Sequence, residues 1–239
     1  MNDINLTLLA MNYGMKVPLH ASPLPEFNFS YVLTDPGFIA YRLLESLEPD
    51  SDDYNHVSCF LKYWKDGETE MAEKYVLERV ETCRLLTILQ AAVHTYDHET
   101  DSTDVSLKML INYLESNPDF PFRILALSLY IEWTLAYSSS AMPVAQLVMQ
   151  MTENEVSDFL CRLQCAHFFV YMDHFDEAIE QYLAIILNEP QKNCDILIQA
   201  LARREIRTII DDVPENLADI LDKQDSEAEN LAIFGNASL

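Results

Sequence analysis

Glycine is scarce in this chain of 239 residues, which contains four. They stand at Gly14, Gly37, Gly67 and Gly235, so none lies between positions 68 and 234. Phosphate-cradling loops and dinucleotide-binding turns need clustered glycines, because the backbone must approach the ligand closely there. The nucleophile elbow G-x-S-x-G is also absent from the sequence. The chain therefore contains neither a nucleotide-binding motif nor this hydrolase motif.

Positive charge is scarce as well. Fifteen Lys and Arg residues stand against 39 Asp and Glu residues, which gives a formal net charge of −24. Such a charge repels phosphate backbones at long range. The composition predicts no direct nucleic-acid binding and favours a cationic partner protein, although an acidic surface that only keeps the protein soluble explains the same excess.

Long apolar runs and a targeting segment are not found. The 20 uncharged residues from Trp133 to Thr152 are long enough to cross a bilayer, but serines at 138–140 and Pro143 interrupt them. Two helices joined at SSSAMP fit this stretch better, so we expect no membrane partner. The start, MNDINLTLLAMNYG, has no positive region of a secretory leader. Five cysteines, an odd number without a secretory context, predict reduced thiols and a cytoplasmic location.

The chain is predicted to have three parts. Residues 1–36 include KVPLHASPLPEFNFSYVLTDP, whose prolines and alternating aromatics indicate an irregular N-terminal segment. Residues 37–225 have the apolar periodicity of helices. Residues 226–239 are predicted to be an acidic, flexible tail.

The central part is predicted to be all-α, with paired helices joined by short connections, which makes neighbours antiparallel. After a first helix around FIAYRLLESLE, the expected pairs are 57–64 with 68–83, 84–96 with 104–116, 123–137 with 143–151, 154–172 with 175–187, and 194–210 with 215–222. Gly67 is expected to end its helix in the left-handed conformation.

One of these pairs carries small and aromatic residues at a recognisable spacing. On its first helix stand Cys165, Ala166 and Phe169, and on its second stand Ala178 and Tyr182, followed by Pro190. This pattern resembles the tetratricopeptide repeat, in which small residues let two helices cross closely and aromatic residues fill the space beside them. Arg162 departs from the pattern, because the family has a bulky apolar residue there.

A second, looser match lies in CFLKYWKDGETEMAEKYV, where Tyr63, Gly67 and Ala72 fit and Phe60 replaces a small residue. The other pairs fit in outline. The resemblance implies a TPR-like α-solenoid of about four to five helical hairpins, whose concave surface is lined by the first helices. A compact helical bundle is the alternative.

The resemblance also suggests where a partner would bind. Leu163, His167 and Tyr171 follow i, i+4, i+8 spacing and would form one stripe on the concave surface, and Leu61 and Trp64 would lie there by the second match. Ordinary packing, or contact with the proline-containing N-terminal segment, is the alternative for these residues.

A cationic cluster completes the predicted partner-binding set. Arg203, Arg204 and Arg207 lie within five positions of a chain that is poor in basic residues. They can bind a carboxylate-bearing peptide, and we include Arg203 and Arg207 in the predicted groove. Alternatively, Arg207 pairs with Asp211 one turn later, and the cluster balances the acidic tail.

Two clusters were weighed as metal sites. His94 and His98 are four residues apart in HTYDHETDSTD, but Thr95 replaces the glutamate of the HExxH motif. Cys161, Cys165 and His167 form the second cluster, which lacks the further cysteine pair that a zinc site would need. We predict no metal and no cofactor.

The sequence therefore favours a non-catalytic protein-protein interaction module, such as an adaptor, scaffold or co-chaperone, that binds a protein or peptide in a helical groove. The alternative is an acidic decoy that occupies a cationic or nucleic-acid-binding protein surface. A metal-dependent enzyme at His94 and His98 is a third option.

Overall fold

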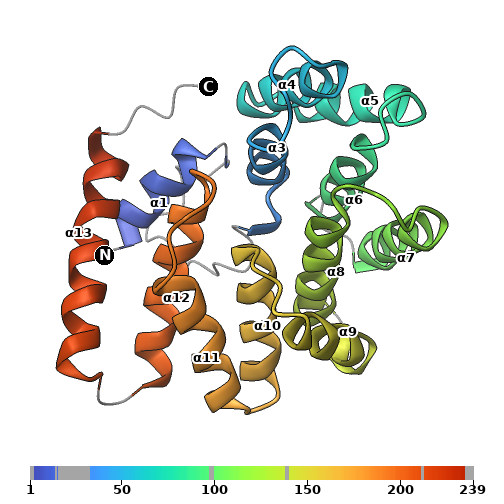
Figure 1. Cartoon of the computed structure of the whole chain (residues 1–239). Coiled ribbons are helices and arrows are strands. Elements are labelled where there is room, and N and C mark those ends of the chain that lie inside the picture. Colours follow the sequence, from blue (N-terminus) through green and yellow to red (C-terminus); the bar gives the residue numbers. More distant parts are fainter. Residues whose placement is uncertain are drawn as a thin grey trace. The chain divides into compact units, whose positions relative to one another are not determined.

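The computed structural model of this chain describes residues 3–13, 15, 33–96, 100–137, 140–210 and 213–234. Every regular element within these ranges is an α-helix, and no strand occurs in them (Figure 1). The expected all-α class is confirmed. None of the described helices is long and apolar enough to cross a membrane.

The helix bounds follow the predicted pairs closely. In chain order the helices are α1 (Asp3–Asn12), α3 (Pro36–Leu44), α4 (Asp52–Lys65), α5 (Thr69–Arg79), α6 (Leu86–Tyr96), α7 (Thr100–Ser116), α8 (Arg123–Tyr137), α9 (Met142–Glu153), α10 (Phe159–Tyr171), α11 (Phe175–Ile186), α12 (Asp195–Ile209) and α13 (Glu215–Phe234).

The chain divides into two compact units. One unit is Tyr13–Tyr137, and the other combines Met1–Asn12 with Ser138–Leu239. In the first unit each helix from α3 to α8 contacts the next, and α3 also packs on α6. In the second unit α9 to α13 again contact one another in sequence, and α1 packs against α12 and α13 (Figure 1). Consecutive packing of this kind is what short connections produce; the stacking of the pairs into a curved array stays a prediction.

Turns in the left-handed conformation end several helices. Gly67 has φ +84° after α4, as predicted, and the N–H of Glu68 donates to the carbonyl of Tyr63 at 3.0 Å. Asp173 has φ +59° after α10, and there the N–H of His174 donates to the carbonyl of Phe169 at 2.8 Å. Both are Schellman motifs, which satisfy carbonyls that the helix end leaves without partners.

The α10–α11 pair is packed as the spacing of its residues predicts. Ala166 and Ala178 are fully buried, and Phe169 and Tyr182 are buried with them. The small side chains let the two helix backbones approach, and the aromatic rings fill the adjoining space.

Both ends of the described chain differ from the prediction. Residues 3–12 form α1 rather than an irregular segment, because Leu6, Leu9 and Ala10 bury one face of this helix. Residues 226–234 continue α13 rather than forming a flexible tail, since Ala228 and Ala232 are also buried. The two helices contact each other, so each buries the apolar face that would be exposed without its neighbour.

Candidate functional site

The predicted groove residues of the first helices lie mostly in the interior. Leu61, Trp64 and Leu163 are 4%, 1% and 0% exposed, so their expected position on an open surface is wrong. The Trp64 indole N–H donates to Asp35 Oδ1 at 3.2 Å, which fixes the ring inside the unit that contains it. These helices are covered on more than one face, so an apolar stripe of theirs becomes core. Contact of these residues with a partner stays a prediction.

His167 and Tyr171 occupy different environments. His167 Nε2 lies 2.8 Å from Glu205 Oε2 of α12, and the Tyr182 hydroxyl of α11 donates to the same oxygen at 2.8 Å. Burial would raise the pKa of Glu205, but the charge of His167 and the two hydrogen bonds lower it below the usual range. Tyr171 is 50% exposed and can contact a partner.

The cationic cluster is largely engaged by α13. Arg203 is buried and its Nε donates to Asp225 Oδ1 at 2.7 Å. Arg207 pairs with Asp225 at 2.9 Å and with Asp222 at 3.1 Å. Asp211, the alternative partner of Arg207, lies outside the described residues. A buried guanidinium cannot reach a peptide, so Arg203 in this arrangement holds two helices together.

Neither cluster that was considered as a metal site, and for which no metal is predicted, gains a complete set of ligands in the described residues. His98 lies outside the described residues, so the His94 and His98 pair stays untested. Across the part of the chain that the structure describes, no three His, Cys, Asp or Glu side chains are grouped to hold a metal ion. His167 therefore does not complete a set with Cys161 and Cys165 in these residues, and its Nε2 lies 2.8 Å from Glu205 Oε2.

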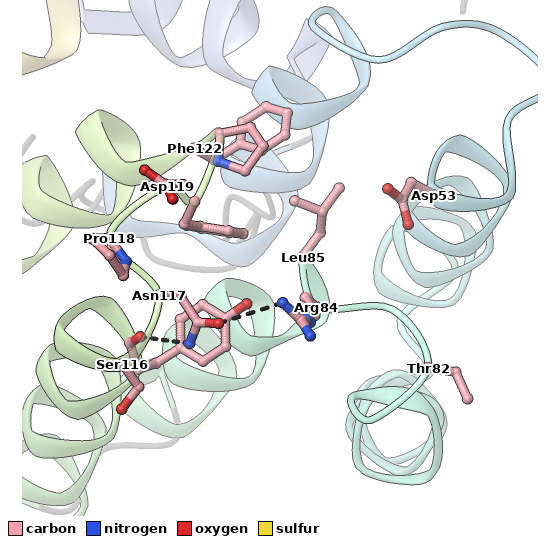
Figure 2. A pocket seen from close by; sticks show the side chains of 12 residues that line it. Asp53, Thr82, Arg84, Leu85, Ser116, Asn117, Pro118, Asp119 and Phe122 are labelled. Atoms are coloured by element: carbon pink, nitrogen blue, oxygen red, sulfur yellow. Dashed lines mark hydrogen bonds between the residues drawn. The ribbon is translucent and has the colours of Figure 1, made fainter.

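A pocket lies where the α5–α6 and α7–α8 connections meet, and its volume is about 550 Å³ (Figure 2). It belongs wholly to the unit Tyr13–Tyr137. Its walls come from the start of α4, the α5–α6 connection, the last turn of α7 and the α7–α8 connection. The lining residues are Asp53, Thr82, Arg84, Leu85, Tyr113, Ser116, Asn117, Pro118, Asp119, Phe120, Pro121 and Phe122.

Apolar side chains form the inner wall of this pocket. Leu85 and Phe120 are buried, and the ring of Phe120 packs edge-on against Tyr113 at 5.2 Å between centroids. The Tyr113 hydroxyl is shielded from solvent and has no hydrogen-bond partner among the residues that the structure describes. Burial raises the pKa of Tyr113, so this hydroxyl stays protonated and can both donate and accept. A buried hydroxyl that lacks a partner costs about 1–3 kcal/mol of stability.

Polar contacts hold the α7 end of the pocket in place. Asn117 Nδ2 donates to the Tyr113 carbonyl at 2.8 Å, and Arg123 donates to the Leu114 carbonyl at 2.8 Å. Both bonds satisfy carbonyls at the end of α7. Arg84 donates to Asn117 Oδ1 at 3.4 Å, the contact drawn in Figure 2, which is long for a hydrogen bond. The guanidinium is therefore loosely held.

Acidic groups prevail around the pocket. Among its described lining residues Arg84 alone is cationic, whereas Asp53 and Asp119 are anionic. The two aspartates lie on either side of Leu85 in Figure 2. Glu81 and Glu115 are exposed, and each is adjacent in the sequence to a lining residue. The pocket thus combines an apolar wall, a buried hydroxyl and an acidic rim, which suits recognition of a ligand that is apolar and basic.

The sequence patterns above did not predict this pocket, whose α7–α8 connection has the sequence NPDFPF. Two prolines interleaved with two aromatic residues in one short connection are the sequence feature that indicates it. No family model matches the chain, and no curated protein or solved structure is significantly similar to it.

Proposed function

We propose that this chain is a non-catalytic protein-interaction module of the tetratricopeptide type, which acts as an adaptor, scaffold or co-chaperone. It binds a short segment of a partner protein in the pocket between the α5–α6 and α7–α8 connections. The consecutive helix pairs and the close α10–α11 crossing support this function.

The observation that carries the proposal is the composition of the pocket wall. Ligand pockets are predominantly apolar with a few convergent polar groups, and typical volumes are roughly 300–1,000 Å³. Here Leu85, Phe120 and Phe122 supply the apolar surface, while the Tyr113 hydroxyl lacks a partner. A peptide places an aliphatic or aromatic side chain on this wall and offers a backbone group to the hydroxyl.

The partner segment is basic. Asp53 and Asp119 stand at opposite sides of the pocket, and the exposed Glu81 and Glu115 extend the negative field around it. A Lys or Arg beside the inserted apolar residue pairs with this rim. Complementary charge of this kind raises the association rate and selects between partners.

A panned library of random nine-residue peptides tests the proposal, with affinities measured by fluorescence anisotropy. We expect the selected peptides to pair one apolar side chain with Lys or Arg. Asp119→Lys should weaken their binding roughly fivefold, because an exposed charge pair contributes up to about 1 kcal/mol. Phe122→Ala should weaken it more, since the apolar wall is lost.

Asp66→Lys is the matched control, because it makes the same charge change at the far end of α4, about 20 Å from Asp53 along the helix. The site would be refuted if the selected peptides bound both pocket variants, Asp119→Lys and Phe122→Ala, with the affinity they have for wild type. The acidic decoy makes a different prediction: its binding would need no apolar residue and would collapse at high salt, where exposed charges are screened. A pocket-bound peptide keeps much of its affinity there.

A further inference from the structure

Three sulfur-containing side chains converge between α9 and α10. Met151 comes from the last turns of α9, and Cys161 and Cys165 come from successive turns of α10. All three are buried. The Cys161 thiol lies 3.1 Å from the Met151 sulfur and donates to it. Cys165 stands one helical turn after Cys161 on α10, and its thiol is hydrogen-bonded with that of Cys161.

The third member of this cluster is not the one that proximity in the sequence suggests. His167 stands two residues after Cys165, but its Nε2 lies 2.8 Å from Glu205 on another helix. Met151 takes the place beside the cysteines instead. It is ten residues from Cys161 and reaches it because α9 packs on α10.

We propose that Met151, Cys161 and Cys165 form a binding site for monovalent copper, with two thiolates and one thioether as ligands. Soft sulfur ligands select soft metal ions, and Cu(I) is the first-row ion that thioethers suit. Zinc sites instead use Cys, His and carboxylate ligands and are almost always four-coordinate. The cluster offers three ligands, one of them a thioether.

The surroundings of the cysteines favour the thiolate that a metal needs. Hydrogen bonding to Cys161 lowers the pKa of Cys165 despite its burial, and Thr152 and the charge of Arg162 act in the same direction. Cys161 lies in the first turn of α10, where the helix dipole favours negative charge, but Asp158 already accepts there from the Cys161 N–H at 3.0 Å. The complex of one Cu⁺ with two thiolates carries one negative charge, and the Arg162 guanidinium on the same helix partly balances it.

The site needs a small adjustment to take the ion. A metal–sulfur bond is about 2.3 Å long, so a trigonal site holds its sulfur atoms about 4 Å apart. Cys161 and Met151 must separate by somewhat less than 1 Å from their 3.1 Å contact. Methionine has three rotatable bonds and adapts its sulfur position readily. Binding replaces both thiol protons, so one Cu(I) enters and two protons leave, with no change of oxidation state.

Anaerobic titration of the full chain with Cu(I), in competition with bicinchoninate, tests the site. We expect one tightly bound ion per chain. Cys161→Ala and Cys165→Ala should each weaken binding at least 100-fold, and Met151→Leu about tenfold, because it removes the neutral ligand and keeps the volume. Lowering the pH by one unit should weaken binding by up to about 100-fold, as two protons compete with the ion.

Cys83→Ala is the matched control, because that thiol is buried elsewhere and lies 3.2 Å from Asp53. It should leave copper affinity unchanged. Circular dichroism of each variant checks that it is folded, and X-ray absorption of the wild-type complex should show a first shell of three sulfur atoms. The proposal is overturned if wild type does not compete with bicinchoninate, if the double variant Cys161→Ala/Cys165→Ala still binds one ion, or if nitrogen or oxygen fills the first shell.

Discussion

The helix pairs α10–α11 and α12–α13 belong to the same unit but are held together in different ways. Between α10 and α11 the contact depends on size, with Ala166 and Ala178 fully buried and Tyr182 filling the space beside them. Between α12 and α13 it depends on charge, because buried Arg203 bonds Asp225 at 2.7 Å. The first pair is stabilised by apolar burial, whereas the second contains matched charges that must stay paired inside the protein.

The difference matters because substitutions change the free energy of unfolding differently at the two kinds of contact. An apolar contact loses free energy in proportion to the surface or the fit that is lost. A buried ion pair adds little net stability, since desolvation opposes the attraction, but removal of one partner leaves an uncompensated charge. The α12–α13 contact should therefore be more sensitive to a single substitution and more tolerant of a double one.

The largest effect is expected for Asp225→Ala, which leaves the Arg203 guanidinium buried without its carboxylate. We expect the free energy of unfolding in urea to fall by about 3–5 kcal/mol. The double variant Arg203→Met/Asp225→Leu should recover most of this loss, because both charges leave together. Asp222→Ala is the control: the Asp222 side chain is 81% exposed, so its loss should cost less than about 1 kcal/mol. A double variant no better than the single one would refute the charge-based account.

Acid should weaken the same contact. Burial alone would raise the pKa of Asp225, but the hydrogen bond from Arg203 and the charges of Arg203 and Arg207 lower it. The unfolded chain, where the pKa is about 3.9, therefore binds the proton more tightly than the folded chain does. The stabilisation is complete above the unfolded pKa and is lost as the pH falls through the folded pKa. Urea unfolding between pH 6 and pH 3 should show wild type losing its advantage over Asp225→Ala.

An intermediate effect is expected for Ala178→Leu in the α10–α11 contact. The larger side chain overpacks a site where the helices cross closely, and we expect the free energy of unfolding to fall by about 1–3 kcal/mol. Glu180→Leu adds a leucine on the exposed face of the same helix and should change stability by less than about 0.5 kcal/mol. Equal effects of the two variants would show that α11 is not closely packed at Ala178.

A smaller effect is expected for Tyr182→Phe, which keeps the ring and removes the hydroxyl that donates to Glu205. Hydrogen bonds to charged groups contribute about 1.5–3 kcal/mol, and His167 still bonds this carboxylate, so we expect a loss near 1.5 kcal/mol. The loss should shrink at low pH, because Glu205 then takes up a proton. Tyr171→Phe, at an exposed tyrosine, should have almost no effect on thermal unfolding.

The two pairs also show which helix contacts can be predicted from the sequence and which cannot. The α10–α11 pair was predictable, because the small and aromatic residues that pack together recur at fixed spacing along two adjacent helices. The partner of Arg203 was not, since Asp225 lies 22 positions away and the register of α12 on α13 decides which carboxylate it meets. For the neighbouring Arg207, an i+4 rule could only suggest Asp211.

The burial of Trp64 and Leu163 agrees with the ordinary packing that the sequence left open as an alternative to the groove. Periodicity identifies the apolar faces of a helix but not how many neighbours cover them, so a second apolar face was interpreted as an open groove. Likewise, Leu6 and Leu9 give a short apolar pattern that becomes helical by packing on α12 and α13. The pocket beside Tyr113 depends on two connections meeting: the prolines and aromatic residues of the α7–α8 connection mark one of them, but no local pattern encodes which segment it meets.

The smallest effect concerns the turn that joins α10 to α11. Asp173 has φ +59°, a conformation that side chains with a Cβ disfavour and glycine adopts freely. Asp173→Gly should raise the free energy of unfolding by roughly 0.5–1 kcal/mol, because the Schellman hydrogen bonds are kept and the steric cost is removed. Gly67→Ala is the reciprocal test: a Cβ there meets no atom within 4 Å, so the expected loss of about 1 kcal/mol comes from φ alone. Both variants could instead lower the melting temperature. In that case the Asp173 side chain itself stabilises the turn, and the α10–α11 pair depends on a polar contact, as the α12–α13 pair does.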